Sequence, residues 1–302
     1  MKKFAFVILN YLTYLETERC VESIRLIGKN QDYKIIVVDN CSPNKSGELL
    51  KTKYENDEDI DVVLLDDNIG FARGNNVGFL KAKNEYNADF ILLCNNDTVI
   101  KTPNFCEKLI EKYRNDPFAV LGPKEILPNG SNYPLNNKYP TLESVEQKIK
   151  NYKQKLRARE NFLFGIYYKF KKTINNLRQV IIKIFKKSKP VEKLDFNQEY
   201  KNLILHGFFL VFSRDYIDKF DGLDDRTYFY GEEDLLAIRL KENNMTSIYY
   251  PTLEVFHNHN SATNARSKNK KEKDIFVYEN MIKSLEIIKG ELKGKWLNEK
   301  IS

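Results

Sequence analysis

The chain has 302 residues, of which 42% are hydrophobic, 13% aromatic and 30% charged, and its formal net charge is +7. This composition is typical of a folded globular protein with one large domain or two small ones, and it excludes an intrinsically disordered chain. No run of 18 apolar residues is present, so the sequence predicts no membrane-spanning helix.

Buried strands alternate with helices in the first hundred residues. The predicted strands are Phe4–Leu9, Lys34–Asp39, Ile60–Leu65 and Phe90–Cys94. The predicted helices between them are Leu15–Ile27, Gly47–Tyr54 and Gly70–Asn84. Strand–helix alternation of this kind predicts an α/β fold in which a mostly parallel central sheet is flanked by helices.

Polar side chains stand where three of these strands end. Asp39, Asn68 and Asp97 follow the second, third and fourth strands, at the edge where open α/β sheets bind their ligands. In Asn95-Asn96-Asp97, two amides and a carboxylate supply the oxygen ligands that Mg2+ or Mn2+ prefers. The convergence favours a nucleotide and metal site, and a turn that caps the next element is the alternative interpretation.

The stretch Gly70-Phe-Ala-Arg-Gly-Asn-Asn-Val-Gly78 opens the third helix. Its glycines are four residues apart, which matches neither a phosphate-binding loop nor a dinucleotide-binding loop. Close packing of the helix on the sheet explains this spacing. A compatible interpretation places Arg73 and the start of the helix near a phosphate group.

A basic segment lies in the middle of the chain. Residues 147–190 contain fourteen Lys or Arg and one acid, Glu160, so the remainder of the chain is net acidic. The pattern of residues 145–187 predicts two amphipathic helices on either side of Gly165. Bulky apolar residues flanked by lysines favour binding to an anionic membrane surface. The alternatives are a helical hairpin packed on the domain and, least favoured, a nucleic-acid site.

The second half of the chain adds further strands and helices. The predicted strands are Ala119–Pro123, Leu203–Ser213 and Ser247–Pro251, and the predicted helices are Phe105–Tyr113, Tyr216–Phe220 and Lys270–Trp296. The stretch Leu253–Thr263 ends the core. His257 and His259 are two residues apart and share a face on an extended chain, which favours contact with a metal or a phosphate.

Three acids follow Gly231 at the start of a helix. Glu232, Glu233 and Asp234 lie where the helix dipole favours negative charge, so capping is one interpretation. Three successive carboxylates exceed what a cap requires, and one of them could serve as a general base.

Six motifs in order resemble one family. They are Val-Ile-Leu-Asn-Tyr, Val-Val-Asp-Asn-Cys-Ser, Asn-Ile-Gly-Phe-Ala-Arg-Gly-Asn-Asn, Leu-Cys-Asn-Asn-Asp, Tyr-Gly-Glu-Glu-Asp and His-Asn-His-Asn-Ser-Ala-Thr. The chain resembles the family 2 glycosyltransferases of the GT-A fold, particularly the rhamnosyl- and galactosyltransferase-like bacterial enzymes of surface polysaccharide synthesis. The resemblance implies a Rossmann-like GT-A domain over residues 1–264 with the basic helical insert at about 141–195. A C-terminal helix within 265–302 would pack on the core.

The resemblance also implies roles for individual residues. The residues implied to contact the donor nucleotide and its phosphates are Asn10, Tyr11, Asp39, Asn68, Gly70, Arg73 and Asn96. The residues implied to bind the metal, Mn2+ or Mg2+, are Asp97 and His257. Here Asn95 replaces the first acid of the family's Asp-x-Asp, which weakens the metal site. Counting back six residues from Arg239 makes Glu233 the catalytic base, with Asp234 second and Glu232 the remaining candidate.

The implied activity is inverting transfer of a sugar from a nucleoside-diphosphate donor to a hydroxyl of a glycan acceptor. We expect a lipid-linked acceptor in the synthesis of capsule, lipopolysaccharide or a related glycan, and no nucleic-acid partner. Four cysteines without metal-like spacing and a short N-terminal apolar run favour a cytoplasmic protein. The basic amphipathic insert favours a peripheral location at the inner face of the membrane.

Two other classes remain open. One is a nucleotidyltransferase on a related sheet, although the sequence lacks the glycine-rich, basic loop after its first strand. The other is a non-catalytic protein that binds membrane or nucleic acid through the basic insert. The oligomeric state stays open.

Overall fold

The computed structural model describes residues 2–168, 173–174, 194–259 and 269–301. The chain divides into two compact units, one formed by Met1–Tyr139 with Phe196–Arg266 and the other by Pro140–Asp195 with Ser267–Ser302. Among the described helices, none combines the length and the apolar character that crossing a membrane requires.

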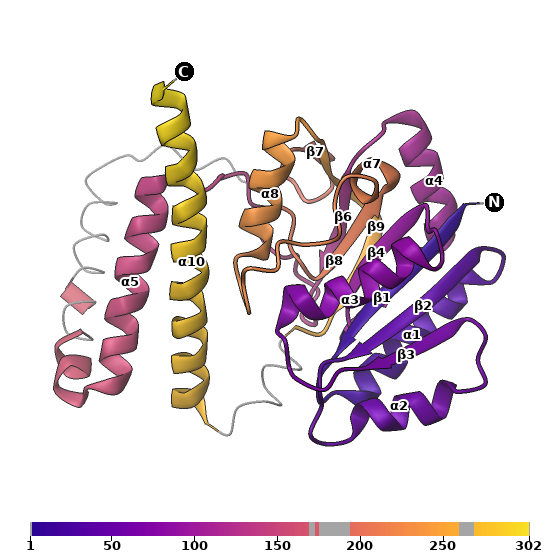
Figure 1. Ribbon diagram of the computed structural model, residues 1–302, viewed down its shortest axis with the longest axis horizontal. Coiled ribbons are helices and arrows are strands. Elements are labelled where there is room, and N and C mark those ends of the chain that lie inside the picture. Colours follow the sequence, from indigo (N-terminus) through magenta and orange to yellow (C-terminus); the bar gives the residue numbers. More distant parts are fainter. Residues whose placement is uncertain (1, 169–172, 175–193, 260–268, 302) are drawn as a thin grey trace. The chain divides into compact units, whose positions relative to one another are not determined.

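The first unit is built on one sheet (Figure 1). Its strands are β1 Lys3–Asn10, β2 Asp32–Asp39, β3 Ile60–Leu64, β4 Phe90–Asn95, β5 Thr98–Ile100, β6 Val120–Ile126, β7 Tyr200–Lys201, β8 Phe209–Ser213 and β9 Ser247–His257. The strand order is β3-β2-β1-β4-β8-β6-β9-β5, and β7 pairs with β9. Strands β1 to β4 are mutually parallel, β8 is antiparallel to β4 and β6, and β9 is parallel to β6. The predicted α/β fold with a mostly parallel sheet is confirmed.

Helices cover both faces of this sheet. They are α1 Tyr14–Gly28, α2 Ser46–Tyr54, α3 Phe71–Asn84, α4 Phe105–Asn115, α7 Arg214–Ile217 and α8 Glu232–Glu242. Alternate side chains of β1 point to opposite faces, so Phe4, Phe6 and Ile8 join the apolar cluster under α1, α2 and α4. Helix α3 lies on the other face (Figure 1). There a Cβ on Gly78 would lie 2.3 Å from Val7 Cγ1, which confirms the predicted close packing of this helix.

Two predicted strand patterns are wrong. The strand Ser247–Pro251 was predicted to end at Pro251, whereas β9 continues to His257. The register of the β6–β9 pair jumps between Pro123 and Lys124, so that residues 251–253 bulge out of the ladder. A proline is tolerated in a bulge because its missing N–H is not needed there. The segment predicted as the strand Leu203–Ser213 is a strand only from Phe209 onward, and His206 precedes it in irregular backbone.

The strand ends that carry the candidate site residues lie along one edge of the sheet, the edge formed by the carboxyl ends of most strands. Strands β1, β2, β3, β4, β6 and β9 all run toward this edge, whereas β8 starts from it. The polar residues at or next to these ends are Asn10, Asp39, Asn68, Asp97, Glu125, His206 and His257. Residues far apart in the sequence therefore meet along a single edge.

The second unit pairs two long helices. Helix α5 Leu142–Glu160 begins at a capping box, in which Thr141 Oγ1 accepts from the backbone N–H of Ser144 at 3.2 Å. Helix α10 Lys270–Ile301 runs beside it (Figure 1), and ion pairs such as Lys153–Glu286 at 3.0 Å connect the two. Most of the predicted second amphipathic helix, beyond residue 168, lies outside the described residues. The prediction that the C-terminal helix packs back on the core stays a prediction.

Candidate functional site

The end of β1 and the loop after β2 are joined by a buried hydrogen-bond network. Asp39 Oδ1 accepts from Asn10 Nδ2 and from Ser42 Oγ, both at 2.6 Å, and Asp39 Oδ2 accepts from the Ser42 backbone at 2.9 Å. Asn10 also donates to Ser46 Oγ at 2.9 Å and accepts from Thr17 Oγ1 at 2.7 Å. Both oxygens of Asp39 therefore have protein donors, and the network holds this part of the edge rigid.

The start of α3 is covered by Tyr228. Asn68 Oδ1 accepts from the Tyr228 hydroxyl at 2.8 Å and from Asn40 Nδ2 at 3.2 Å. The Phe71 amide donates to the Tyr228 carbonyl at 2.8 Å. Gly70 has a φ of +91°, and a Cβ there would lie 2.5 Å from the same carbonyl, so only glycine fits. Because the Phe71 amide already donates its hydrogen bond to the Tyr228 carbonyl, an anion at the start of α3 would have to be bound by other groups.

Two further residues predicted to bind the nucleotide lie near the same edge. Arg73 is exposed, and its Nε donates to the carbonyl of Asp225 at 3.0 Å. Tyr11 directly follows β1 and is partly exposed. Their predicted contacts with donor nucleotide or phosphate stay predictions.

Asn96 is turned toward α1. Its buried side-chain amide donates to Thr13 Oγ1 at 2.5 Å and to Thr17 Oγ1 at 2.9 Å. The backbone N–H of Asn95 donates to the Phe208 carbonyl at 2.8 Å. These contacts fix the turn that carries Asp97, which gives Asn96 a structural role beside its predicted one at the nucleotide.

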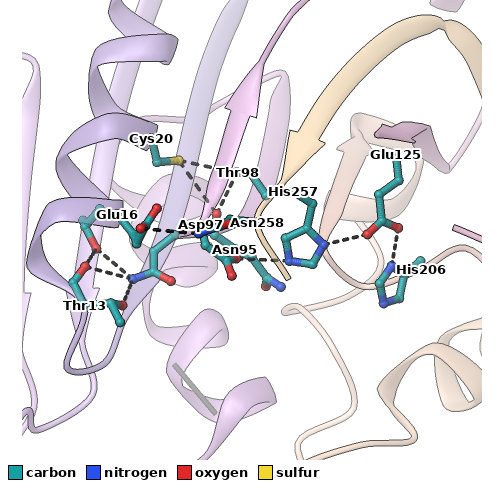
Figure 2. Close-up of polar contacts among 12 residues, drawn as sticks. Thr13, Glu16, Cys20, Asn95, Asp97, Thr98, Glu125, His206, His257 and Asn258 are labelled. Atoms are coloured by element: carbon teal, nitrogen blue, oxygen red, sulfur yellow. Dashed lines mark hydrogen bonds and ion pairs between the residues drawn. The ribbon is translucent and has the colours of Figure 1, made fainter. Parts of the chain in front are cut away.

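Asp97 and His257 meet because β5 pairs with β9, with Thr98 opposite His257. Asp97 Oδ1 lies 3.1 Å from His257 Nε2, and both side chains are buried (Figure 2). Two ligands of one octahedral Mg2+ or Mn2+, each at about 2.1 Å, lie about 3.0 Å apart. The pair therefore fits a divalent cation, and its predicted role as the metal site stays a prediction.

Glu125 supports His257 from the other side of the ring. Glu125 Oε1 lies 2.6 Å from His257 Nδ1, the arrangement by which a carboxylate commonly orients a metal-binding histidine. Burial opposes the positive charge, but the hydrogen bonds to Asp97 and Glu125 outweigh it and raise the pKa of His257 to about 9. A cation bound at Nε2 would take the place of the proton on that nitrogen.

Glu125, His206 and His257 form a second group that could hold an ion, since their ligand atoms lie within 4.8 Å of one another. However, Glu125 Oε1 and Oε2 each lie 2.6 Å from the Nδ1 of one histidine, a hydrogen-bond distance that leaves no room for a cation between them. Burial acts to raise the pKa of Glu125, and the hydrogen bonds from His206 and His257 outweigh it and lower that pKa. The contacts favour an ionised acceptor of two hydrogen bonds.

The three acids at the start of α8 have different surroundings. Glu232 is buried beside Thr227, and burial raises its pKa to about 8. Glu233 is partly exposed, its Oε1 accepts from the Gly207 amide at 2.9 Å, and the same oxygen lies 3.8 Å from His206 Nε2. Asp234 is also partly exposed. Of the three, Glu233 is the acid that these contacts join to the histidines, and its predicted role as the base stays a prediction.

The sequence interpretation missed Glu125 and His206. Glu125 is the one acid in the strand Val120–Ile126, and an acid in such a strand must find a partner if it is buried. His206 is one of only three histidines in the chain. These two signals could have suggested a pair, but their separation of 81 positions gave no local pattern.

Comparisons with known proteins bear on this arrangement. The chain matches the model of the family described as Glycosyl transferase family 2 over residues 6–220. A comparison with curated protein sequences found no significant match.

Several solved structures share the fold. The fragment 1–349 of S. aureus TarS has a TM-score of 0.52 at 13% identity, over 93% of this chain and 71% of that one. The same fragment in complex with UDP has a TM-score of 0.51 at 13% identity, with the same shares covered. GalNAc-T7 with UDP, GalNAc and Mn2+ has a TM-score of 0.54 at 12% identity, over 86% of this chain and 44% of that one. This chain spans 41% of the longer TarS chain.

At these identities the structural likeness shows the fold alone, and it confirms the predicted GT-A architecture. The family match spans well over half of the 302 residues and confirms the family that the motifs resemble. The chain belongs to family 2 of the glycosyl transferases.

Proposed function

We propose that this chain transfers a sugar from a uridine-diphosphate donor to a hydroxyl group of a glycan acceptor, with inversion at the anomeric carbon. The family match supports sugar transfer. UDP is the nucleotide named for the solved structures of both TarS and GalNAc-T7. Asn10, Asp39 and Asn68 stand at the ends of parallel strands, where α/β proteins of this kind bind nucleotides.

The base in this proposal is Glu233. The acceptor hydroxyl must lose its proton as it attacks, and a partly exposed carboxylate can take that proton. The Gly207 amide, 2.9 Å from Oε1, fixes the orientation of the carboxylate. Attack from the face opposite the leaving diphosphate inverts the anomeric carbon in a single displacement, so the chain needs no covalent nucleophile.

Asp97 and His257 would hold Mn2+ or Mg2+. Such a cation, when bound, stabilises the negative charge that builds on the departing diphosphate. Arg73 is the cationic side chain that we propose for the same charge. The observation that carries the proposal is the 3.1 Å approach of Asp97 to His257, connected through Glu125 and His206 to Glu233.

The test is a donor screen. Purified protein with Mn2+ is incubated with UDP-, GDP- and dTDP-sugars, and mass spectrometry follows the release of nucleoside diphosphate and the sugar product. We expect release of UDP, and loss of that release in Glu233→Gln and in Asp97→Ala. Release of pyrophosphate would instead indicate a nucleotidyltransferase. Full activity in both variants would contradict the assigned site.

We also propose that the acceptor is lipid-linked, as in synthesis of capsule, lipopolysaccharide or related surface glycans, and that the second unit binds an anionic membrane. Large apolar side chains are exposed in residues 162–168, where Phe162 is 80% and Leu163 76% exposed. A groove beside them is lined by basic side chains, including Lys150, Lys153 and Arg157. Exposed apolar groups next to basic ones suit the interface of anionic lipids.

Co-sedimentation with liposomes tests this second proposal. We expect binding to vesicles with anionic lipid, weaker binding to zwitterionic vesicles, and reduced binding for Phe162→Ser combined with Leu163→Ser. The matched control is Leu26→Ser, an exposed leucine of the first unit. Equal binding to both kinds of vesicle by the wild type and the double variant would contradict a role for this surface.

A further inference from the structure

Glu125 contacts two histidines at once. It lies buried at the end of β6, with Oε1 2.6 Å from His257 Nδ1 and Oε2 2.6 Å from His206 Nδ1 (Figure 2). An ionised carboxylate accepts hydrogen bonds and has no proton to donate. Both histidines must therefore carry a proton on Nδ1.

The contacts of both Nδ1 atoms with Glu125 fix the direction in which the Nε2 atom of each histidine points. In an imidazole ring Nδ1 and Nε2 lie on different sides, so the histidines turn their Nε2 atoms away from Glu125. His257 Nε2 then lies 3.1 Å from Asp97 Oδ1, and His206 Nε2 lies 3.8 Å from Glu233 Oε1. Glu125 thus orients the ring of His257 toward Asp97, the other proposed metal ligand. It orients the ring of His206 toward Glu233, the proposed base.

The ring of His206 is also held in its plane. It stacks on Tyr133 with ring centroids 3.9 Å apart and an interplanar angle of 4°. The neighbouring Gly207 amide donates to the same Glu233 oxygen that His206 faces. The two successive residues therefore approach Glu233 Oε1 together, one by its side chain and the other by its backbone.

We propose that Glu125 is a positioning residue that sets the tautomers of His206 and His257 together, and that it thereby directs His206 Nε2 toward Glu233, whose Oε1 the Gly207 amide holds. The inference rests on the proposed function for the roles of Asp97 and Glu233. It adds two residues to that site, and it connects the metal end to the acceptor end through a single buried side chain.

The first test reads the tautomers directly. The chain has three histidines, so long-range proton–nitrogen correlation spectra of protein with nitrogen-15-labelled histidine contain three imidazole patterns. The variants His206→Gln and His259→Gln assign them. In the wild type we expect protonated Nδ1 atoms in both His206 and His257. An unprotonated Nδ1 in either would overturn the inference without any variant of Glu125.

The variant Glu125→Gln sharpens this test. Its amide has one acceptor oxygen and one donor NH2 group, so it can accept from only one histidine and must donate to the other. We expect one of the two histidines to lose its Nδ1 proton and carry it on Nε2. The matched control is Glu254→Gln, a partly exposed acid on β9 that pairs with Lys124, and it should leave all three patterns unchanged. Unchanged tautomers in a folded Glu125→Gln protein would contradict the proposal.

Kinetics and metal binding complete the test. Glu125→Gln should lower kcat about 10- to 100-fold, the usual effect of losing a group that orients a metal ligand, with a smaller change in the KM for donor. His206→Gln should lower kcat while the Mn2+ affinity, measured by electron paramagnetic resonance, changes less than about twofold. A loss of Mn2+ binding in His206→Gln would place the ion among Glu125, His206 and His257 and overturn the proposal.

The spectra require neither donor, acceptor nor metal, which separates this inference from the proposed function. If both Nδ1 atoms are protonated in the wild type and one loses its proton in Glu125→Gln, but the wild type transfers no sugar, the proposed function alone would be broken. An active enzyme with unchanged tautomers in Glu125→Gln would break only the inference.

Discussion

The two halves of the candidate site are held together by different chemistry. At the nucleotide half, around Asp39, amides and hydroxyls from Asn10, Ser42 and Ser46 make short buried hydrogen bonds. At the catalytic half, carboxylates and imidazoles alternate from Asp97 through the histidines to Glu233. Of these four side chains at the nucleotide half, only Asp39 is a carboxylate, whereas every side chain of the second half is a carboxylate or an imidazole.

This difference predicts different responses to substitution. Removal of a partner from the nucleotide half leaves buried donors unsatisfied and should reduce stability and binding together. Removal of one charge from the partly exposed end of the catalytic half should reduce turnover while the fold is kept. Variants from each half can therefore test whether the two halves differ in this way.

The largest effect is expected for Glu233→Gln. If Glu233 is the proposed general base, its loss should lower kcat by a factor of about 10^2 to 10^4 while the affinity for UDP stays within twofold. Steady-state kinetics and calorimetric titration with UDP measure the two quantities. The control is Asp234→Asn, the neighbouring partly exposed acid, for which we expect near-normal turnover. The opposite result, a large loss for Asp234→Asn and a small one for Glu233→Gln, would move the base by one residue.

The next effect concerns the metal end. In Asp97→Asn, a neutral amide replaces the carboxylate that faces His257 Nε2 at 3.1 Å, and we expect the Mn2+ affinity in the presence of UDP to fall at least about tenfold. Paramagnetic resonance of free Mn2+ measures the change. Thr98→Ser, at the adjacent buried position, serves as the control. An unchanged Mn2+ affinity in Asp97→Asn would show that the Asp97 carboxylate does not bind the cation.

The sequence predicted the two halves unequally. Asp39 ends one buried strand and Asp97 follows another within two residues, and the order of elements along the chain is enough to bring such ends to one edge. The rest of the catalytic half depends on tertiary pairing: β6 lies beside β9 only because of strand order, and this brings Glu125 to His257. No short-range pattern contains that information.

Local deviations explain the remaining errors. Pro251 suggested a break in the strand because proline lacks the N–H of a ladder, whereas the structure places it in a bulge. The apolar run before Phe209 suggested a strand, yet Leu203 to Leu205 are buried in irregular backbone that delivers His206 to the site. Burial alone does not distinguish these conformations.

The third prediction tests the nucleotide half. In Asp39→Asn, one buried acceptor oxygen becomes an NH2 group facing donors of Asn10 or Ser42, which should lower the free energy of unfolding by about 1–3 kcal/mol. Urea denaturation measures this, and calorimetry should show weaker UDP binding in the same variant. Asp66→Asn, at an exposed position, is the control. Weaker UDP binding with unchanged stability would show that Asp39 contacts the nucleotide without holding the network.

The effect most specific to pH, and the smallest on turnover, is expected for Glu232→Gln. Burial raises the pKa of Glu232 to about 8 in the folded protein, from an ordinary value of 4.5. Between these pH values the folded state binds more protons than the unfolded state, so this group makes the free energy of unfolding fall as pH rises from about 4.5 to about 8.

Glutamine resembles the protonated acid and does not titrate, so the difference in stability between Glu232→Gln and the wild type should grow in favour of the variant across that window. It should reach on the order of a few kcal/mol near pH 8 and approach zero near pH 4.5. Urea denaturation at a series of pH values measures it, and Glu48→Gln, an exposed acid of α2, should show no such trend. A constant difference across the window would mean that Glu232 is ionised in the fold. Glu232 would then compete with Glu233 as the base.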